Sequence, residues 1–407
     1  MKQHAKHGKQ AVVSIAAGAS QLPLIRAARD LGYEVVGVDR DPEAAGLAHC
    51  ALRVECSTRD ADAVVRELDA LRERVELCAV LTQSSGAPVV TAARAAEHLG
   101  LLGLGVRVAR ASASKPAMLE LAREAGLVVP ERIAVRRLEE WRGAPPLPLV
   151  LKPACAQGGK HGVGLARSAH EIAARFAAAR AASDDGVVEI EELVAGDDVV
   201  ACVFFDGAGA RTALFLDEDS GFDARGLAGA RGISVPSARA SAQDRARIEA
   251  AASALASACD VGTGVGFLTF RVRPVGPPVL IEVHFDLGGD SIAAALLPLA
   301  LGRPWIPDVV RWMAAEPCPD PRYDPLPTAL RFVCARDADR CERLLEIETL
   351  PGVRELAIDG GTDAPGWARV GYVAVQAPSL DALRERVRAV DAALASPFQE
   401  SPLSLYS

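Results

Sequence analysis

A lysine at the end of a short apolar run lies just before a glycine-rich segment. The run is predicted as a strand over residues 149–152, and Lys152 is its last residue. The segment that follows contains Gly158, Gly159, Lys160, His161 and Gly162. Glycines let backbone N–H groups approach phosphate oxygens, and the cationic side chains would balance phosphate charge. The pattern favours a triphosphate site. Its spacing is not that of a Walker P-loop, and an ordinary glycine turn beside a solvated lysine is the alternative.

A second candidate feature is an apolar strand that ends in carboxylates, predicted over residues 187–191. Its last residue is Glu191, and Glu192, Leu193 and Val194 follow, with Asp198 a little further on. A strand end of this kind can present backbone groups to an adenine ring and an acid to ribose hydroxyls. An edge strand with solvated acids is the alternative, and it stays open on these residues alone.

A third candidate feature lies on a strand predicted over residues 279–285, with Glu282, His284 and Asp286 at alternate positions. Because strand residues two apart point to the same face, these three side chains are expected to line one side. Two carboxylates and an imidazole on one face can hold a divalent cation. The alternative is a solvated strand face.

The elements that must position these groups begin with a βα rhythm in the N-terminal part of the chain. Strands are predicted at residues 12–17, 34–38 and 77–81, and helices at 22–31, 60–74 and 88–99. This alternation is typical of an α/β fold with a doubly wound parallel sheet. The first turn holds only Gly18 and not a Gly-x-Gly-x-x-Gly pattern, so a dinucleotide site here has little support.

The rest of the chain mixes helices and strands. Helices are predicted at residues 115–124, 170–181, 242–259 and 292–301, and further strands at 199–205, 266–272, 329–334 and 371–376. Residues 136–148 and 221–236 are interpreted as a connection and a long loop, because they are rich in proline or glycine. Five prolines in residues 317–327 indicate a boundary before a small α+β module.

Composition and net charge exclude some classes of protein. The chain has 407 residues and a formal net charge of −8, which argues against a general nucleic-acid binder. Nine scattered cysteines without a Cys-x-x-Cys pair are typical of reduced thiols in a cytoplasmic protein. No stretch reaches the roughly 20 apolar residues of a membrane span. The lysine-rich start faintly resembles a signal peptide, but its short apolar run fits a buried first strand better.

The three candidate features, in this order, resemble the ATP-grasp superfamily, in the branch of carbamoyl-phosphate synthetase, biotin carboxylase and the L-amino-acid ligases. Residues 113–130 (ASKPAMLELAREAGLVVP) look like the segment that carries the first ATP lysine, which matches Lys115. The resemblance makes Lys152 the second ATP lysine and residues 158–163 the phosphate-covering loop. It makes residues 191–194 the adenine hinge, Asp198 the ribose acid and Glu282 the main magnesium ligand.

The resemblance implies a three-part α/β architecture. Residues 1–110 would form a pre-ATP-grasp βα domain, residues 111–320 the core with a flap at about 130–200, and residues 321–407 a C-terminal subdomain. It also implies a ligase that joins a small carboxylate to an amine through an acyl phosphate, with ATP and Mg²⁺ or Mn²⁺ as cofactors. Expected partners are small amino-acid-like substrates of specialised metabolism, without nucleic acid or membrane; a homodimer is allowed.

The sequence departs from the family pattern at the metal site. Thr269 stands where the first magnesium glutamate is usual, while Arg271 keeps the arginine of that motif. His284 and Asp286 replace an asparagine and an arginine. We therefore assign catalytic roles to Lys152, Arg271 and Asp286, and metal binding to Glu282, His284 and Asp286. Two alternatives remain open: a non-catalytic nucleotide-binding protein that regulates or scaffolds a partner, and an enzyme that uses bicarbonate.

Overall fold

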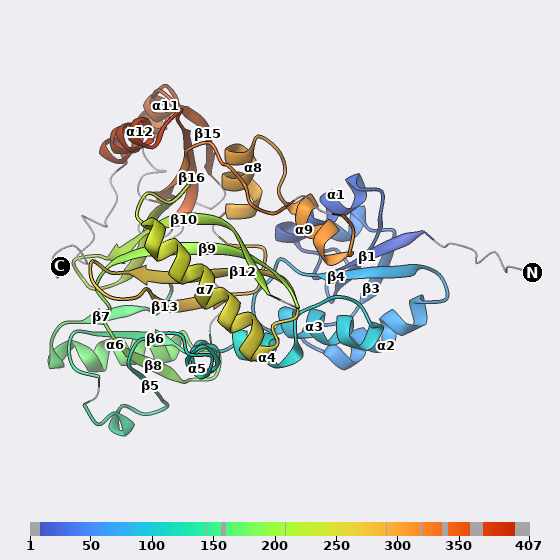
Figure 1. The fold of residues 1–407 in the computed structure, drawn as a ribbon, viewed down its shortest axis with the longest axis horizontal. Helices are drawn as coiled ribbons and strands as arrows, with labels where there is room; N and C mark the ends of the chain where they lie inside the picture. The colour runs from blue at the N-terminus through green and yellow to red at the C-terminus, as the bar shows by residue number, and fades with distance from the viewer. Residues whose placement is uncertain are drawn as a thin grey trace, which may run out of the picture.

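The N-terminal sheet is parallel, as the βα rhythm predicts. The computed structural model describes residues 9–143, 145–155, 160–207, 209–289, 291–317, 320–335, 341–358 and 369–394. The sheet has the order β3-β2-β1-β4, built from β1 (Gln10–Ile15), β2 (Glu34–Asp39), β3 (Leu52–Glu55) and β4 (Glu76–Leu81). One face carries α2 (Ala61–Leu71) and α3 (Ala87–Leu99), and the other carries α1 (Leu22–Asp30) (Figure 1).

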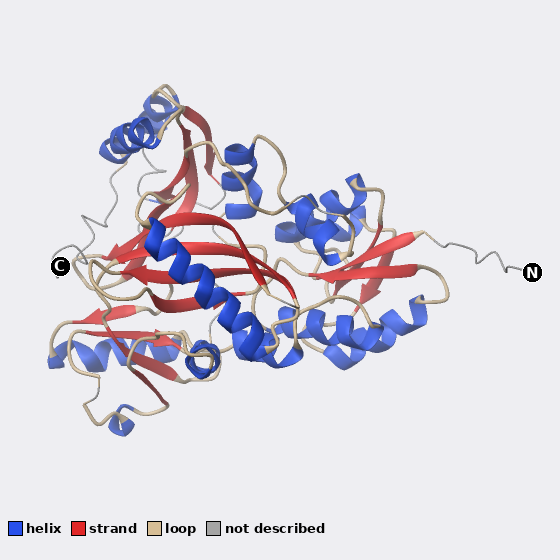
Figure 2. Cartoon of the chain, in the orientation of Figure 1, coloured by secondary structure: helices blue, strands red, loops and turns tan. Residues whose placement is uncertain are grey.

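A larger antiparallel sheet forms the centre of the molecule (Figure 2). Its order is β13-β12-β9-β10-β11-β14-β16-β15. The strands are β9 (Asp197–Asp206), β10 (Ala210–Phe222), β11 (Ala228–Val235), β12 (Thr263–Val272), β13 (Val279–His284), β14 (Thr328–Cys334), β15 (Val353–Ile358) and β16 (Arg369–Gln376). The C-terminal strands thus continue the sheet of the core through the pairing of β11 with β14.

The prediction of a long loop over residues 221–236 is wrong. β10 continues to Phe222, and β11 occupies Ala228–Val235, so that only a tight turn separates the two strands. The glycines that suggested a loop serve close packing instead. A Cβ atom at Gly232 would lie 2.2 Å from the carbonyl oxygen of Leu330 on the neighbouring strand. Small residues are required there because two backbones approach each other.

A small antiparallel sheet lies beside the large one, with the order β5-β8-β6-β7. It contains β5 (Arg132–Val135), β6 (Leu149–Pro153), β7 (Gly164–Ala166) and β8 (Val188–Glu192). Helix α6 (Ala169–Ala181) begins with a capping box of Ser168 and Glu171 and packs its apolar side on this sheet. Helix α5 (Lys115–Glu124) has the bounds that the sequence predicts.

The remaining helices join the sheets. Helix α7 (Ala242–Cys259) crosses the large sheet (Figure 2), and α4 (Val106–Ser112) precedes α5. The predicted helix at residues 292–301 is present as a wide π turn, Ile292–Leu296, that continues into α8 (Leu297–Leu301). Helices α9 (Ile306–Met313), α11 (Cys341–Glu348) and α12 (Leu380–Ala393) complete the described part. None of the helices in the described residues is long and apolar enough to span a bilayer.

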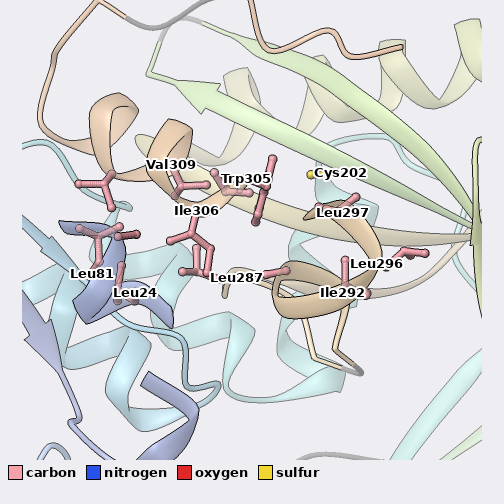
Figure 3. Packing of buried hydrophobic residues seen from close by; sticks show 14 of the residues in the cluster. Leu24, Leu81, Cys202, Leu287, Ile292, Leu296, Leu297, Trp305, Ile306 and Val309 are labelled. Atoms are coloured by element: carbon pink, nitrogen blue, oxygen red, sulfur yellow. The ribbon is translucent and has the colours of Figure 1, made fainter. Parts of the chain in front are cut away.

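One hydrophobic core connects the N-terminal sheet to the large sheet (Figure 3). Leu24 and Leu81 from the N-terminal part pack near Ile306 and Val309 of α9. The same cluster includes Trp305, which is fully buried and meets the ring of Phe204 edge-on at 6.1 Å between centroids. Burial of this apolar surface stabilises the contact between the two parts, and so fixes the position of the β4–α3 loop relative to the large sheet.

Candidate active site

Two adjoining cavities lie between the small sheet and the large sheet. The first, which we call the hinge cavity, has an empty volume of about 830 Å³ and reaches residues 191–194. The second, the inner cavity, has an empty volume of about 1140 Å³ and extends toward the β4–α3 loop. Both cavities are lined by Lys115, Lys160, Glu218, Thr269 and Glu282. Side chains predicted from separate segments of the sequence therefore meet at one place.

The lysines of this site come from three different elements. Lys115 is the first residue of α5, Lys152 lies on β6, and Lys160 follows the glycine-rich segment. Each ammonium group contacts a carboxylate. Lys115 Nζ lies 2.6 Å from Glu282 Oε1, Lys152 Nζ 2.8 Å from Glu191 Oε2, and Lys160 Nζ 2.7 Å from Glu218 Oε1. These ion pairs hold the lysines along the walls of the two cavities.

Lys152 is the most deeply buried of the three lysines, with 5% of its surface exposed. Burial opposes its charge, but the carboxylates of Glu189 and Glu191 outweigh that effect and raise the pKa of Lys152. Burial likewise raises the pKa of Glu191, against the attraction of Lys152. Lys152 is therefore a protonated cation held between two acids at the back of the hinge cavity. Glu189 also contacts Arg132, at 3.3 Å.

The predicted hinge leaves β8 and crosses toward the large sheet. Its backbone is held on both sides, because the N–H of Leu193 donates to Pro148 O (3.2 Å) and the guanidinium of Arg271 donates to Val194 O (2.8 Å). Among the described residues nothing accepts a hydrogen bond from the N–H of Val194. Residues 191–194 line the hinge cavity together with Val150 and Ile281, so a flat apolar ring with a hydrogen-bond acceptor fits there.

Asp198 and Arg271 also line the hinge cavity, but they are engaged with each other. Arg271 Nε donates to Asp198 Oδ1 at 2.6 Å, and the hydroxyl of Ser220 donates to the other carboxylate oxygen of Asp198. Burial acts to raise the pKa of Asp198, but Arg271 and Lys160 outweigh it and lower that pKa. The ribose role of Asp198 and the catalytic role of Arg271 stay predictions. In this structure the pair connects residues 191–194 to β9 and β12, because Arg271 binds both Asp198 and the carbonyl of Val194.

Glu282, His284 and Asp286 all line the inner cavity. Glu282 Oε1 accepts from both Lys115 and His284, with His284 Nε2 at 3.2 Å. Burial opposes ionisation of Glu282, but Lys115 and His284 hold its pKa well below the usual range. Glu282 in turn raises the pKa of His284 to about 9. Asp286 lies beyond the end of β13 and is buried, which raises its pKa. In the part of the chain that is described, no group of three or more His, Cys, Asp or Glu side chains is arranged to hold a metal ion.

The glycine-rich segment is described only in part. Gly158 and Gly159 lie outside the described residues. His161 is exposed, and it lines neither cavity. Gly162 has a φ of +76°, and a Cβ atom there would lie 2.5 Å from the Cβ of Ala182. A glycine is needed at this position because the loop packs against the end of α6.

Two residues of the site are absent from the sequence predictions. Glu218 is the counter-ion of Lys160, and Glu189 is a second counter-ion of Lys152, beside Glu191. Glu218 lies on β10, which was not predicted as a strand because its apolar run ends in the acidic residues 217–219. Glu189 lies two positions before Glu191, so strand periodicity already places both acids on one face.

Comparison with known proteins supports the fold. No protein-family model matches the sequence, and neither does any curated protein. Among solved structures, an ADP complex of PurK, N5-carboxyaminoimidazole ribonucleotide synthetase, is similar with a TM-score of 0.73 and 16% identity over 96% of this chain and 98% of that one. The L-amino acid ligase of Bacillus licheniformis matches at 0.72 and 16% identity over 96% and 98% of the two chains.

A third similar structure is phosphoribosylglycinamide synthetase from Anaerococcus prevotii, with a TM-score of 0.65 and 16% identity over 95% of this chain and 98% of that one. All three likenesses extend over nearly the whole of both chains. The mixed architecture of parallel and antiparallel sheets described above agrees with them. The chain therefore has the ATP-grasp fold that the sequence resemblance predicts.

Proposed function

We propose that this protein is an ATP-dependent carboxylate–amine ligase that forms an amide through an acyl-phosphate intermediate on small amino-acid-like substrates. The observation that carries the proposal is the meeting of three lysines from three elements along two adjoining cavities. A triphosphate has several negative charges, and fixed cations from independent elements suit it better than one lysine does. The names of the similar structures, which are synthetases and a ligase, support the same class.

In this proposal ATP occupies the hinge cavity. The adenine lies between Val150 and Ile281, and the N–H of Val194 donates to a ring nitrogen. Lys152 contacts the inner phosphates, while Lys115 and Lys160 exchange their carboxylate partners for phosphate oxygens. Positioning and neutralisation of charge supply most of the catalysis in such phosphoryl transfers.

The inner cavity is the proposed place of the carboxylate substrate. Its carboxylate oxygen attacks the terminal phosphorus, ADP leaves, and the acyl phosphate remains beside Lys115 and Lys160. An amine then attacks the acyl carbon, the C–O bond to phosphate breaks, and inorganic phosphate departs. The wall formed by Ile233, Phe267 and Ile292 excludes water from one side of this cavity, which protects the acyl phosphate from hydrolysis.

Of the three side chains predicted to bind a divalent cation, two are engaged with each other in this structure. The sequence predicts Mg²⁺ or Mn²⁺ on Glu282, His284 and Asp286. Glu282 already pairs with Lys115 and His284, and the described residues contain no cluster of three metal-ligating side chains. These groups do not fit a metal in the observed arrangement, and no step of the proposed reaction uses one.

The proposal is tested by incubating the protein with ATP, Mg²⁺ and a panel of carboxylic acids in the presence of hydroxylamine. Hydroxylamine traps an acyl phosphate as a hydroxamate, so ADP release and hydroxamate should appear together for at least one acid. ADP release that depends on bicarbonate alone would favour the bicarbonate-using enzyme.

A second candidate is a nucleotide-binding protein without turnover. The engagement of Glu282 by two cations favours it, because that carboxylate is the predicted main metal ligand. Binding of ATP without ADP release for any acid would support this candidate over the ligase.

A further inference from the structure

An apolar pocket lies behind the inner cavity, where the N-terminal part meets the large sheet. Its empty volume is about 450 Å³. Its walls come from β4, α3, the start of β12 and α9, and include Leu81, Ala93, Leu104, Val265, Val309 and Met313. Leu81 and Val309 face each other across the domain contact in Figure 3. The pocket is thus built from both parts of the molecule.

Only two side chains that line this pocket, among the described residues, carry an oxygen or nitrogen atom: Thr82 and Asp286. The hydroxyl of Thr82 donates to Ile15 O at 2.7 Å and accepts from the N–H of Ser84, so Thr82 is satisfied within the protein. Asp286 differs. Its Oδ1 accepts from the N–H of Gly288 at 2.9 Å, and the described residues give its Oδ2 no hydrogen bond. A carboxylate that is 8% exposed with a spare oxygen needs a partner.

Asp286 is also the residue that joins the apolar pocket to the inner cavity, since it lines both. The cations of the inner cavity are already paired with other acids. Lys115 and His284 contact Glu282, and Lys160 contacts Glu218. The nearest protein cations therefore leave Asp286 available to a charged group that arrives with a ligand.

We propose that Asp286 and the apolar pocket together form the amine subsite of the proposed ligase. The substrate's ammonium group binds the Asp286 carboxylate, and its apolar side chain enters the pocket. The nitrogen attacks the acyl carbon once it has lost a proton, and the departing inorganic phosphate takes the two protons that the nitrogen gives up as the amide forms. This deepens the proposed function and rests on it. A carboxylic acid is excluded from the same place, because its charge would repel Asp286 in a site with little water. The substrate class is thus a primary amine with a small aliphatic group.

The first test measures how the reaction depends on the size of the amine. The probes are methylamine, propylamine, isobutylamine and benzylamine, offered with an acid that gives hydroxamate. Each methylene that enters the pocket should raise kcat/KM about fourfold, until the pocket is full. Hydroxylamine, which has no side chain to bury, reports acyl-phosphate formation alone and serves as the reference. The amide-to-hydroxamate ratio should therefore rise from methylamine to isobutylamine and fall for benzylamine, whose ring is larger than the pocket.

The second test changes the pocket. Ala93→Val fills it and should lower the amide-to-hydroxamate ratio for isobutylamine at least tenfold. Met313→Ala enlarges it and should move the optimum to longer amines. Ala95→Val is the matched control, since Ala95 is a buried alanine of the same helix that packs on the N-terminal sheet instead, and it should keep the wild-type ratio.

The third test measures binding without turnover. Isothermal titration of isobutylamine should show binding to the wild type and at least tenfold weaker binding to Asp286→Asn. Two results together would overturn the amine subsite while leaving the ligase intact. The first is hydroxamate formation with the same kcat/KM for all amines, and the second is the same amide-to-hydroxamate ratio in Ala93→Val and Ala95→Val. Absence of both ADP release and hydroxamate for every acid would overturn the ligase, and isobutylamine that fails to bind would overturn the subsite.

Discussion

Arg271 and Asp198 lie directly opposite each other on neighbouring strands, and the Nε of Arg271 donates to Asp198 Oδ1 at 2.6 Å in a buried position. The same guanidinium holds the carbonyl of Val194. One side chain therefore connects the large sheet to the predicted adenine hinge. This makes the pair a positioning device for the nucleotide site, and it can be tested by stability as well as by activity.

Replacing Asp198 by asparagine should destabilise the protein by about 3–5 kcal/mol at neutral pH, because it leaves Arg271 buried without its counter-ion. The pKa of Asp198 is lowered in the folded state, so its stabilisation is fully present above the unfolded pKa and is lost as pH falls through the folded pKa. The difference in free energy of unfolding between wild type and Asp198→Asn should therefore be constant above about pH 5 and shrink at lower pH. Urea unfolding at several pH values measures it. A difference that is unchanged at low pH would contradict the role of the charge.

Lys160→Ala should weaken ATP binding at least tenfold, or about 1.4 kcal/mol, with little effect on stability because its side chain is partly exposed. Lys152→Ala should weaken ATP binding by at least as much and also destabilise the protein, since it leaves Glu191 buried without its cation and Glu189 with Arg132 alone. Calorimetric titration and thermal unfolding separate the two effects. Lys9→Ala, at an exposed lysine outside the site, is the control and should change neither. Unchanged ATP affinity in folded Lys152→Ala would argue against a phosphate site here.

Gly232→Ala should destabilise the protein by about 1–3 kcal/mol, because the new Cβ atom would lie 2.2 Å from the carbonyl oxygen of Leu330. Gly18→Ala is the matched control, since a Cβ atom there meets nothing within 4 Å. Denaturant unfolding compares the two variants. Equal stabilities would contradict the pairing of β11 with β14 in this register.

The strands and helices that the sequence predicts correctly are those whose signal is local. The bounds of α5 and α7 are as predicted, because a proline, a serine cap or an alanine-rich run marks their ends. The sequence does not predict β10, since its acidic end looks like a loop when its partners are unknown. Residues 221–236 were misinterpreted for the same reason. A glycine between two closely packed strands has the same sequence signal as a glycine in a turn.

In the candidate site too, residues in local motifs are predicted from the sequence, whereas contacts between distant strands are not. Lys115, Lys152 and Glu282 belong to local motifs, and the structure brings Lys115 and Glu282 to 2.6 Å from each other. The pairing of Lys160 with Glu218, and of Arg271 with Asp198, joins residues on strands that are distant in sequence. Sequence periodicity can place an acid on one face of its own strand, but it does not determine which strand lies beside it.

The altered metal position offers a further test. Thr269 pairs with Glu282 across β12 and β13, so a carboxylate at position 269 would lie next to that of Glu282. Thr269→Glu should bind Mn²⁺ at least tenfold more tightly than the wild type in the presence of ADP, because it adds a second oxygen ligand with charge. Thr269→Gln, similar in size and neutral, is the control. Electron paramagnetic resonance of free Mn²⁺ measures both. Equal affinities in the two variants would show that position 269 does not face a metal.

The most direct test of the central claim follows an oxygen atom. A carboxylic acid that supports ADP release is labelled with ¹⁸O in its carboxylate and incubated with ATP, Mg²⁺ and an amine, and the released inorganic phosphate is examined by mass spectrometry. An acyl-phosphate mechanism transfers one carboxylate oxygen to phosphorus, so each amide formed should be matched by one ¹⁸O atom in phosphate. Amide formation with unlabelled phosphate, or label that appears in AMP instead, would contradict the proposed mechanism.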